Sequence, residues 1–167
     1  MSERAERGVR IAAGPVSLAG DLVRPEGADG LVLFAHGSGS SRKSPRNRYV
    51  AGVLQDAGFA TLLMDLLTMD EEHAERAGAR RRFDIDLLAG RLAGATDWVM
   101  THPDTAGLPI GYFGASTGAA AALVAAAQRP KTSRRWSRAA GGPISPALRC
   151  AGSRPRRSSS SGVSTTS

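Results

Sequence analysis

The chain has 167 residues, of which 41% are hydrophobic, and this fits one globular domain with a single core. No apolar run approaches the roughly 18 residues of a membrane span, and no signal peptide opens the sequence, so we expect a cytoplasmic protein without a membrane partner. The single cysteine, Cys150, excludes an internal disulfide. No Cys/His cluster has the spacing of a zinc site, and no cofactor is expected.

The formal net charge of +7 comes from one end of the sequence. Residues 1–130 carry 14 Lys and Arg against 15 Asp and Glu, whereas residues 131–167 carry 8 basic side chains and no acid. A basic segment can bind RNA or DNA, which gives one hypothesis of function. Only Trp136 supplies an aromatic ring to this segment, so nucleic acid is not the expected partner.

The first predicted element is an antiparallel hairpin at one edge of a sheet. Residues 8–24 alternate weakly between apolar and polar side chains around Gly14-Pro15. Three continuous apolar runs then have the pattern of strands buried on both faces: 31–35, 60–65 and 108–113.

A helix is predicted after the first buried strand. Ser44 is its N-cap, Pro45 its first residue and Gly58 its stop. Helical spacing places five side chains on one face: Tyr49, Val50, Val53, Leu54 and Ala57.

A second helix is predicted from about residue 84 to 101, and a third after residue 118. The inner stripe of the second consists of Leu88, Leu92, Ala95 and Val99. The charged segment 70–82 before it is interpreted as a solvated loop, with a substrate-contacting lid as the alternative. Strands alternating with helices predict an α/β fold with a doubly wound, mostly parallel sheet behind the N-terminal hairpin.

Residues 114–118 read Gly-Ala-Ser-Thr-Gly, a G-x-S-x-G sequence between the third apolar run and an alanine-rich helical stretch. This motif is typical of a nucleophilic serine on the strand–turn–helix connection of a hydrolase site. The strained backbone at such a serine leaves no room for side chains at Gly114 and Gly118. We therefore predict that Ser116 is a catalytic nucleophile, with an ordinary helix-capping serine as the alternative.

Residues 36–41 read His-Gly-Ser-Gly-Ser-Ser and follow the first buried strand, at the end where α/β sheets bind ligands. In hydrolases with a serine turn, this loop supplies one backbone N–H of the oxyanion hole, here Ser38, and Thr117 supplies the other. Gly37 and Gly39 let the loop turn its amides inward. The alternative is a non-catalytic module whose 36–41 loop binds a phosphate or acidic ligand, although the G-x-x-x-x-G-K-[ST] order is absent.

Partners for the serine are sought among the histidines and acids. His36 precedes the nucleophile and is expected to orient its loop rather than act as the base. His73 and His102 are expected to be solvated surface residues, and Asp65 is expected to cap the loop that follows it. Residues 117–167 contain no Asp, Glu or His, although the acid and base follow the nucleophile in this architecture.

Residues 9–130 resemble the dienelactone-hydrolase-like branch of the α/β-hydrolase superfamily. The resemblance rests on LVLFAHGSGSSRKSPRNRYVA at 31–51, TLLMDLLT at 61–68, RFDIDLLAGRL at 82–92 and LPIGYFGASTGAAAALVAAA at 108–127. It implies a small serine hydrolase of esters or lactones, with a small molecule as its partner, alone or joined to a phosphoribosyltransferase domain. The acidic strand and Thr-Gly phosphate loop of such a transferase are absent from this sequence.

The sequence departs from the family pattern at about Lys131, so residues 1–130 are expected to form the N-terminal part of a hydrolase domain. Residues 131–167 have the composition of a disordered basic tail. If Ser158 to Ser161 are TCN codons, reading one nucleotide upstream makes each NTC, which encodes Leu, Ile, Val or Phe. The strand that the family has next, PTLLIVGGxD, fits that frame. We therefore hypothesise a single-nucleotide frameshift near codons 130–133, which leaves the fold incomplete at the C-terminus.

Overall fold

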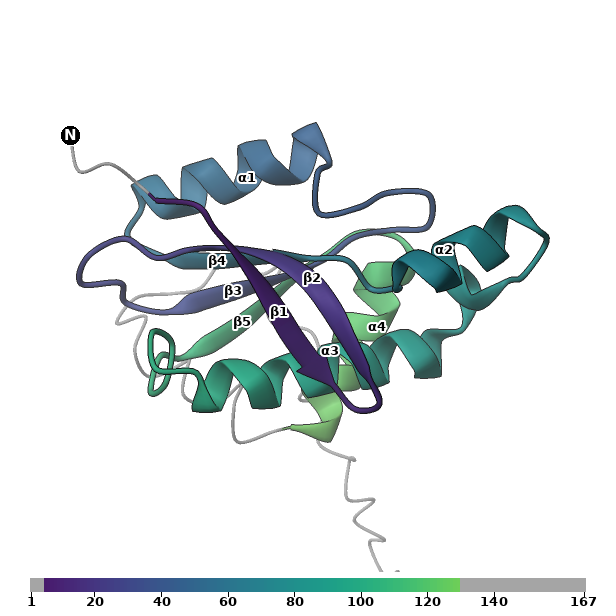
Figure 1. The fold of residues 1–167 in the computed structure, drawn as a ribbon. Coiled ribbons are helices and arrows are strands. Elements are labelled where there is room, and N and C mark those ends of the chain that lie inside the picture. Colours follow the sequence, from purple (N-terminus) through teal and green to yellow (C-terminus); the bar gives the residue numbers. More distant parts are fainter. Residues whose placement is uncertain (1–4, 130–167) are drawn as a thin grey trace, which may run out of the picture.

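The computed structural model of the chain describes residues 5–129, and the predictions for residues 131–167 lie outside this range. A five-stranded mixed sheet forms the middle layer (Figure 1). Its order is β1-β2-β4-β3-β5. Strands β4 and β5 run parallel to β3 on either side of it, whereas β2 is antiparallel to β4 and to β1. The strands are β1 (Arg7–Ala13), β2 (Val16–Val23), β3 (Leu31–Ala35), β4 (Ala60–Met64) and β5 (Ile110–Gly114).

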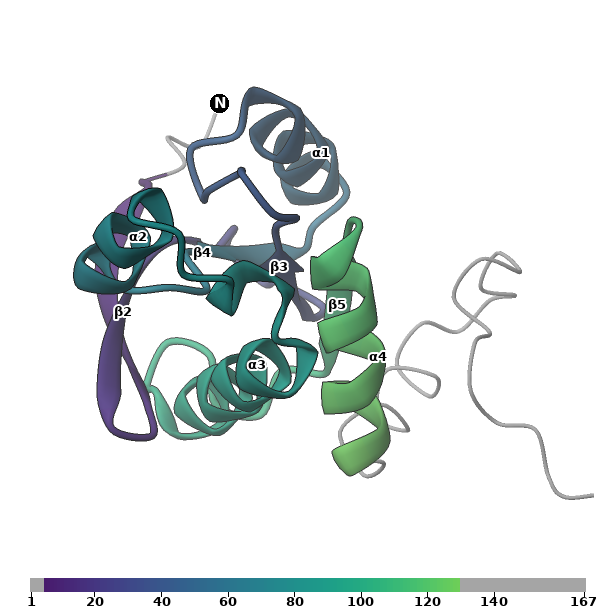
Figure 2. The same ribbon diagram turned by 90° about the vertical axis from the view of Figure 1, so that its right-hand side faces the viewer.

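Helices cover both faces of the sheet. One face carries α1, and the other carries α3 and α4 (Figures 1 and 2). The α-helices are α1 (Pro45–Asp56), α2 (Met69–Arg76), α3 (Ile85–Thr101) and α4 (Thr117–Gln128), and a single 3₁₀ turn, η1 (Arg81–Phe83), precedes α3. The predicted α/β fold with a doubly wound, mostly parallel sheet is confirmed. Among residues 5–129, no helix is long and apolar enough to cross a membrane.

The N-terminal hairpin forms as predicted. Ala13 pairs with Val16 across the two-residue turn, and Gly14 has a φ of +64°, which glycine adopts without steric cost. Ile11 and Leu18 pair with each other and are fully buried, so the alternation places one face of the hairpin in the core.

The core lies mainly between the sheet and the pair α3 and α4. It contains the fully buried Leu31, Leu33 and Leu62 from the inner strands. The predicted inner stripe of α3 is buried throughout: Leu88, Leu92, Ala95 and Val99. A smaller cluster on the opposite face of the sheet packs against α1.

The start and stop predicted for α1 are confirmed, but its predicted inner face is partly wrong. Ser44 accepts a hydrogen bond from the Asn47 N–H, as an N-cap does. Asn47 and Ala51 are buried, with Val50 and Leu54 beside them, whereas Tyr49 is 75% and Val53 51% exposed. The small side chain of Ala51 faces the sheet, and this turns the larger Tyr49 and Val53 toward solvent.

The charged segment 70–82 is not a solvated loop. It contains α2, whose N-terminus is closed by a capping box between Thr68 and Glu71. Thr68 accepts from the Glu71 N–H, and the Glu71 carboxylate accepts from the Thr68 N–H at 2.8 Å. Sequence spacing Thr-x-x-Glu is the signal that could have identified this helix.

Candidate active site

The serine turn, residues 114–118, joins β5 to α4. Ser116 has a φ of 53° and a ψ of −127°, and no other non-glycine residue between 5 and 129 has a positive φ. Such a conformation costs on the order of 1–3 kcal/mol, so it persists only where the surrounding structure imposes it. Ser116 is also exposed, although its neighbours in the turn are at least half-buried.

Gly114 and Gly118 flank Ser116 at positions where no side chain fits. A Cβ atom on Gly114 would lie 2.8 Å from the Cα of Ala119. A Cβ atom on Gly118 would lie 2.2 Å from the carbonyl oxygen of Ala35 and 2.5 Å from that of His36. The two glycines therefore let α4 begin directly against the end of β3.

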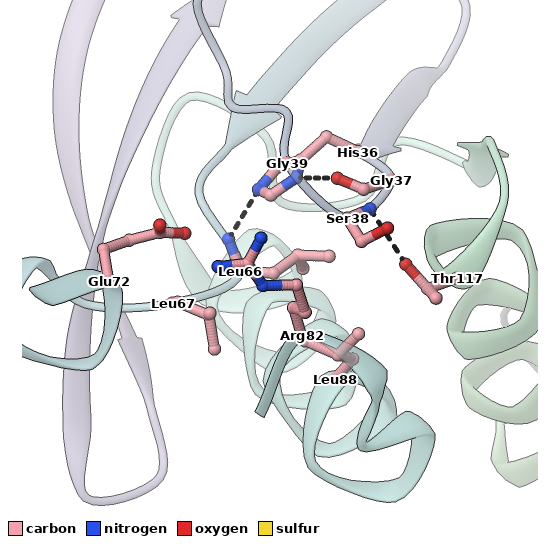
Figure 3. Close-up of a pocket in the computed structure, with 10 residues that line it drawn as sticks. All are labelled: His36, Gly37, Ser38, Gly39, Leu66, Leu67, Glu72, Arg82, Leu88 and Thr117. Atoms are coloured by element: carbon pink, nitrogen blue, oxygen red, sulfur yellow. Dashed lines mark hydrogen bonds between the residues drawn. The ribbon is translucent and has the colours of Figure 1, made fainter. Parts of the chain in front are cut away.

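The 36–41 loop is attached to the chain after β4 by the imidazole of His36. Its Nε2 accepts a hydrogen bond from the Leu66 N–H at 3.1 Å (Figure 3). Because Nε2 accepts, Nδ1 carries the ring proton and donates to the Gly37 carbonyl oxygen at 3.0 Å. His36 is only 7% exposed, and both of its ring nitrogens have protein partners.

The loop and the serine turn, predicted as parts of one site, lie next to each other. A Cβ atom on Gly37 would be 3.2 Å from the Cβ of Ser116. The Ser38 N–H donates to the Thr117 hydroxyl at 3.1 Å (Figure 3). Sequence reasoning assigned that amide to a substrate oxyanion and missed its contact with the Thr117 side chain.

A small pocket opens beside this contact (Figure 3). Leu66, Leu67 and Leu88 supply its apolar lining, and Glu72 and Arg82 supply its charged lining. The two charged residues come from α2 and η1, the segment that the sequence analysis interpreted as solvated. That segment therefore contributes to the shape and charge of the site.

Buried ion pairs hold α2 and η1 in place. Glu71 accepts hydrogen bonds from Arg91 of α3 at 2.6 Å and from Arg81 at 3.2 Å. Glu75 pairs with the guanidinium of Arg82 and accepts from the Arg81 N–H at 2.6 Å. The carboxylates of both acids are almost fully buried, so these contacts compensate for the loss of water around them.

Acid is expected to weaken this attachment through Glu75. The hydrogen bond from Arg82 lowers the pKa of the Glu75 carboxyl below its ordinary value of 4.5, and outweighs burial, which acts in the opposite direction. A carboxyl whose pKa is lower in the folded state than in the unfolded state stabilises the protein at pH values above the unfolded-state pKa. This stabilisation is lost as the pH falls through the folded-state pKa. The melting temperature of Arg82→Gln should therefore fall less steeply than that of the wild type below about pH 4.5.

Arg80→Gln removes the same charge from an exposed neighbour and is the control for this comparison. Its melting temperature should follow the wild-type dependence on pH. Parallel curves for Arg82→Gln and the wild type would contradict the assigned role of the Glu75 pair.

The remaining candidate residues are Asp65, His73 and His102. Asp65 does not cap the loop that follows it, because its carboxylate accepts from the Arg42 N–H, 23 residues earlier in the chain, at 2.8 Å. His73 is exposed, as expected. His102 is mostly buried, contrary to expectation, because its ring packs on Trp98 with 4.3 Å between ring centroids. No group of three His, Cys, Asp or Glu side chains within residues 5–129 could hold a metal ion.

Comparison with solved structures places this architecture among the α/β hydrolases. A dienelactone hydrolase from Anabaena variabilis matches with 63% identity and a TM-score of 0.76, over 78% of this chain and 60% of that one. An alpha-beta serine hydrolase homologue from Coxiella burnetii matches over 74% of this chain and 58% of its own, at 17% identity and a TM-score of 0.60, which shows the shared fold alone. The described residues have an α/β-hydrolase architecture.

Within that superfamily, the described residues are dienelactone-hydrolase-like in sequence and structure. No family model matches it. Two Mycobacterium tuberculosis proteins, provisionally named phosphoribosyl transferases, are 66% identical to it over 119 residues, which is 71% of this chain. The chain spans 26% of the length of these curated relatives.

Proposed function

We propose that the domain is a serine hydrolase of small esters or lactones, with Ser116 as the nucleophile. The observation that carries the proposal is the positive φ of the exposed Ser116 within a strand–turn–helix connection. Glycines on both sides allow that conformation, and the 36–41 loop lies against it. In the reaction, the Ser116 oxygen bonds to the substrate carbonyl carbon, its proton passes to a base, and the alcohol leaves before water releases the acyl group.

Backbone amides are proposed to stabilise the oxyanion of this reaction. Thr117 is the first residue of α4, so its N–H has no acceptor within the helix, and the positive end of the helix dipole lies there. Ser38 provides the second N–H once the substrate oxygen replaces the Thr117 hydroxyl as its acceptor.

His36 is proposed to orient the loop, not to act as the base. Both of its ring nitrogens are engaged, one with the Leu66 amide and the other with the Gly37 carbonyl. Residues 117–167 provide no other histidine and no acid. We therefore expect little or no turnover from the 167-residue chain, and we assign the missing acid and base to the alternative reading frame.

The names of the relatives support hydrolysis more than phosphoribosyl transfer. The Anabaena protein is named a dienelactone hydrolase, and its match with this chain covers most of this chain. The chain matches 26% of the length of the Mycobacterium proteins, so their name covers far more sequence than this chain shares with them. We therefore do not extend the transferase name of the Mycobacterium proteins to this chain.

A fluorophosphonate tests the nucleophile directly. Without a base, the labelling reaction is expected to be slow but still measurable. In serine proteases that lack a triad member, the oxyanion hole and binding alone retain about 10³–10⁴-fold acceleration. Peptide mass spectrometry should still find the adduct on Ser116 ahead of the other serines, and Ser116→Ala should lose it. Equal labelling of all serines, together with saturable binding of inorganic phosphate, would favour the alternative of a phosphate-binding module.

A further inference from the structure

We propose that Arg42 is a positioning residue that holds the 36–41 loop, and with it the Ser38 amide, against the serine turn. The inference rests on the proposed function, because it concerns how the oxyanion site is built. It assigns to Arg42 no contact with substrate.

Arg42 attaches the far end of the loop to two strands. Its backbone N–H donates to the Asp65 carboxylate at 2.8 Å, and its guanidinium pairs with the same carboxylate. The Nε–H donates to Asp21 at 3.3 Å. Asp21 belongs to β2 and Asp65 directly follows β4, so one side chain joins the loop to both strands.

His36 attaches the near end of the loop to Leu66, the residue after Asp65. Its imidazole accepts from the Leu66 amide, and Leu66 follows Asp65 in the chain. Residues 37–41 therefore lie between two attachments to the same short segment after β4. Within this interval the Ser38 amide contacts Thr117, and the Ser40 N–H donates to the Gly37 carbonyl at 3.1 Å.

The two carboxylates differ in how much they depend on Arg42. Asp21 also pairs with Lys43 at 2.7 Å and with Arg48 at 3.6 Å, so it keeps two cations when Arg42 is lost. Among the residues described, Arg42 is the one cation within ion-pair distance of Asp65. Asp65 is mostly buried, so an unpaired charge there would be costly. Burial alone would lower the pKa of the Arg42 guanidinium, but the carboxylates of Asp65 and Asp21 outweigh it and raise that pKa.

The matched variants are Arg42→Gln and Lys43→Met. Each removes one cation from Asp21, but only Arg42→Gln removes the cation of Asp65. Two measurements on the full chain apply to both variants: amide hydrogen exchange of residues 37–41, and the first-order rate and half-saturation concentration for fluorophosphonate labelling of Ser116.

We expect Arg42→Gln to speed exchange at residues 37–41 and to lower the labelling rate about tenfold, because a misplacement of about 1 Å is costly in an oriented site. The half-saturation concentration and the exchange of β3 should stay unchanged, as should every measurement in Lys43→Met. If Arg42→Gln does not fold, Asp65→Asn is the second variant: it keeps a side-chain oxygen that accepts from the Arg42 backbone N–H, loses the charge and should give the same results.

Unchanged exchange at residues 37–41 overturns the inference, and so does an unchanged labelling rate in a variant whose loop exchanges faster. If the wild type takes up no label on Ser116, the proposed function fails. In that case, the exchange measurement still decides whether Arg42 holds the loop.

Discussion

The 167-residue chain is expected to hydrolyse an activated ester no faster than its Ser116→Ala variant. A serine hydroxyl near its ordinary pKa is a weak nucleophile, and here no base follows it in the sequence. Loss of one triad member typically costs about 10⁴–10⁶ in kcat. Initial rates with a p-nitrophenyl ester, measured side by side for the two proteins, check this expectation.

Restoring the other reading frame from codons 130–133 should raise the rate at least about 10⁴-fold if it supplies the acid and base. Ser116→Ala in the restored chain is the control and should remove the gain. Turnover by the 167-residue chain at ordinary enzyme rates, dependent on Ser116, would contradict the expected inactivity. A restored chain that stays inactive while folded would contradict the assignment of the missing residues to that frame.

Gly118→Val is expected to destabilise the fold by more than about 4 kcal/mol, the range reserved for severe disruptions. Its Cβ would lie 2.2 Å and 2.5 Å from two backbone carbonyl oxygens at the end of β3. Backbone cannot move aside as a flexible side chain can, so either α4 or the end of β3 must shift. Urea unfolding monitored by circular dichroism should show a lower midpoint or no folded baseline.

Gly52→Ala is the matched control within a helix. A Cβ atom at Gly52 of α1 would meet no atom within 4 Å. Alanine is favoured over glycine in a helix interior by about 0.8–1.0 kcal/mol, so this variant should be slightly more stable than the wild type. Equal stability of Gly118→Val and Gly52→Ala would mean that α4 does not start against β3 as described.

Patterns local in sequence predicted most of the elements. The run 31–35 is β3 to the residue, because a strand buried on both faces has no polar interruption. The strand predicted at 108–113 begins two residues too early and ends one residue too early, since β5 is Ile110–Gly114. Pro109 has no N–H for the ladder, and its carbonyl accepts from Leu31 at 2.8 Å just before the strand.

Contacts between distant residues could not be predicted from such patterns. The charges of Glu71 and Glu75 suggested solvent, but Arg91 and Arg82 neutralise them inside the fold. In the same way, the sequence placed the Ser38 amide near the serine turn but not in contact with the Thr117 hydroxyl, 79 residues away. The family pattern predicted which residues form the proposed site, but the hydrogen-bond partners of their polar atoms could be identified only in the structure.

The strand order also has a consequence for the order in which the domain assembles during synthesis. Strand β3 is synthesised early, but its neighbour β5 follows much later in the chain. Leu31 of β3 pairs with Ile110 of β5, and all residues of α1, α2 and α3 lie between them in the sequence. Closing so long a loop costs entropy before the pairing returns any stability, so contacts of this kind slow folding. The edge of β3 that β5 covers therefore stays unpaired until the ribosome has released β5, and during this interval it can pair with another chain.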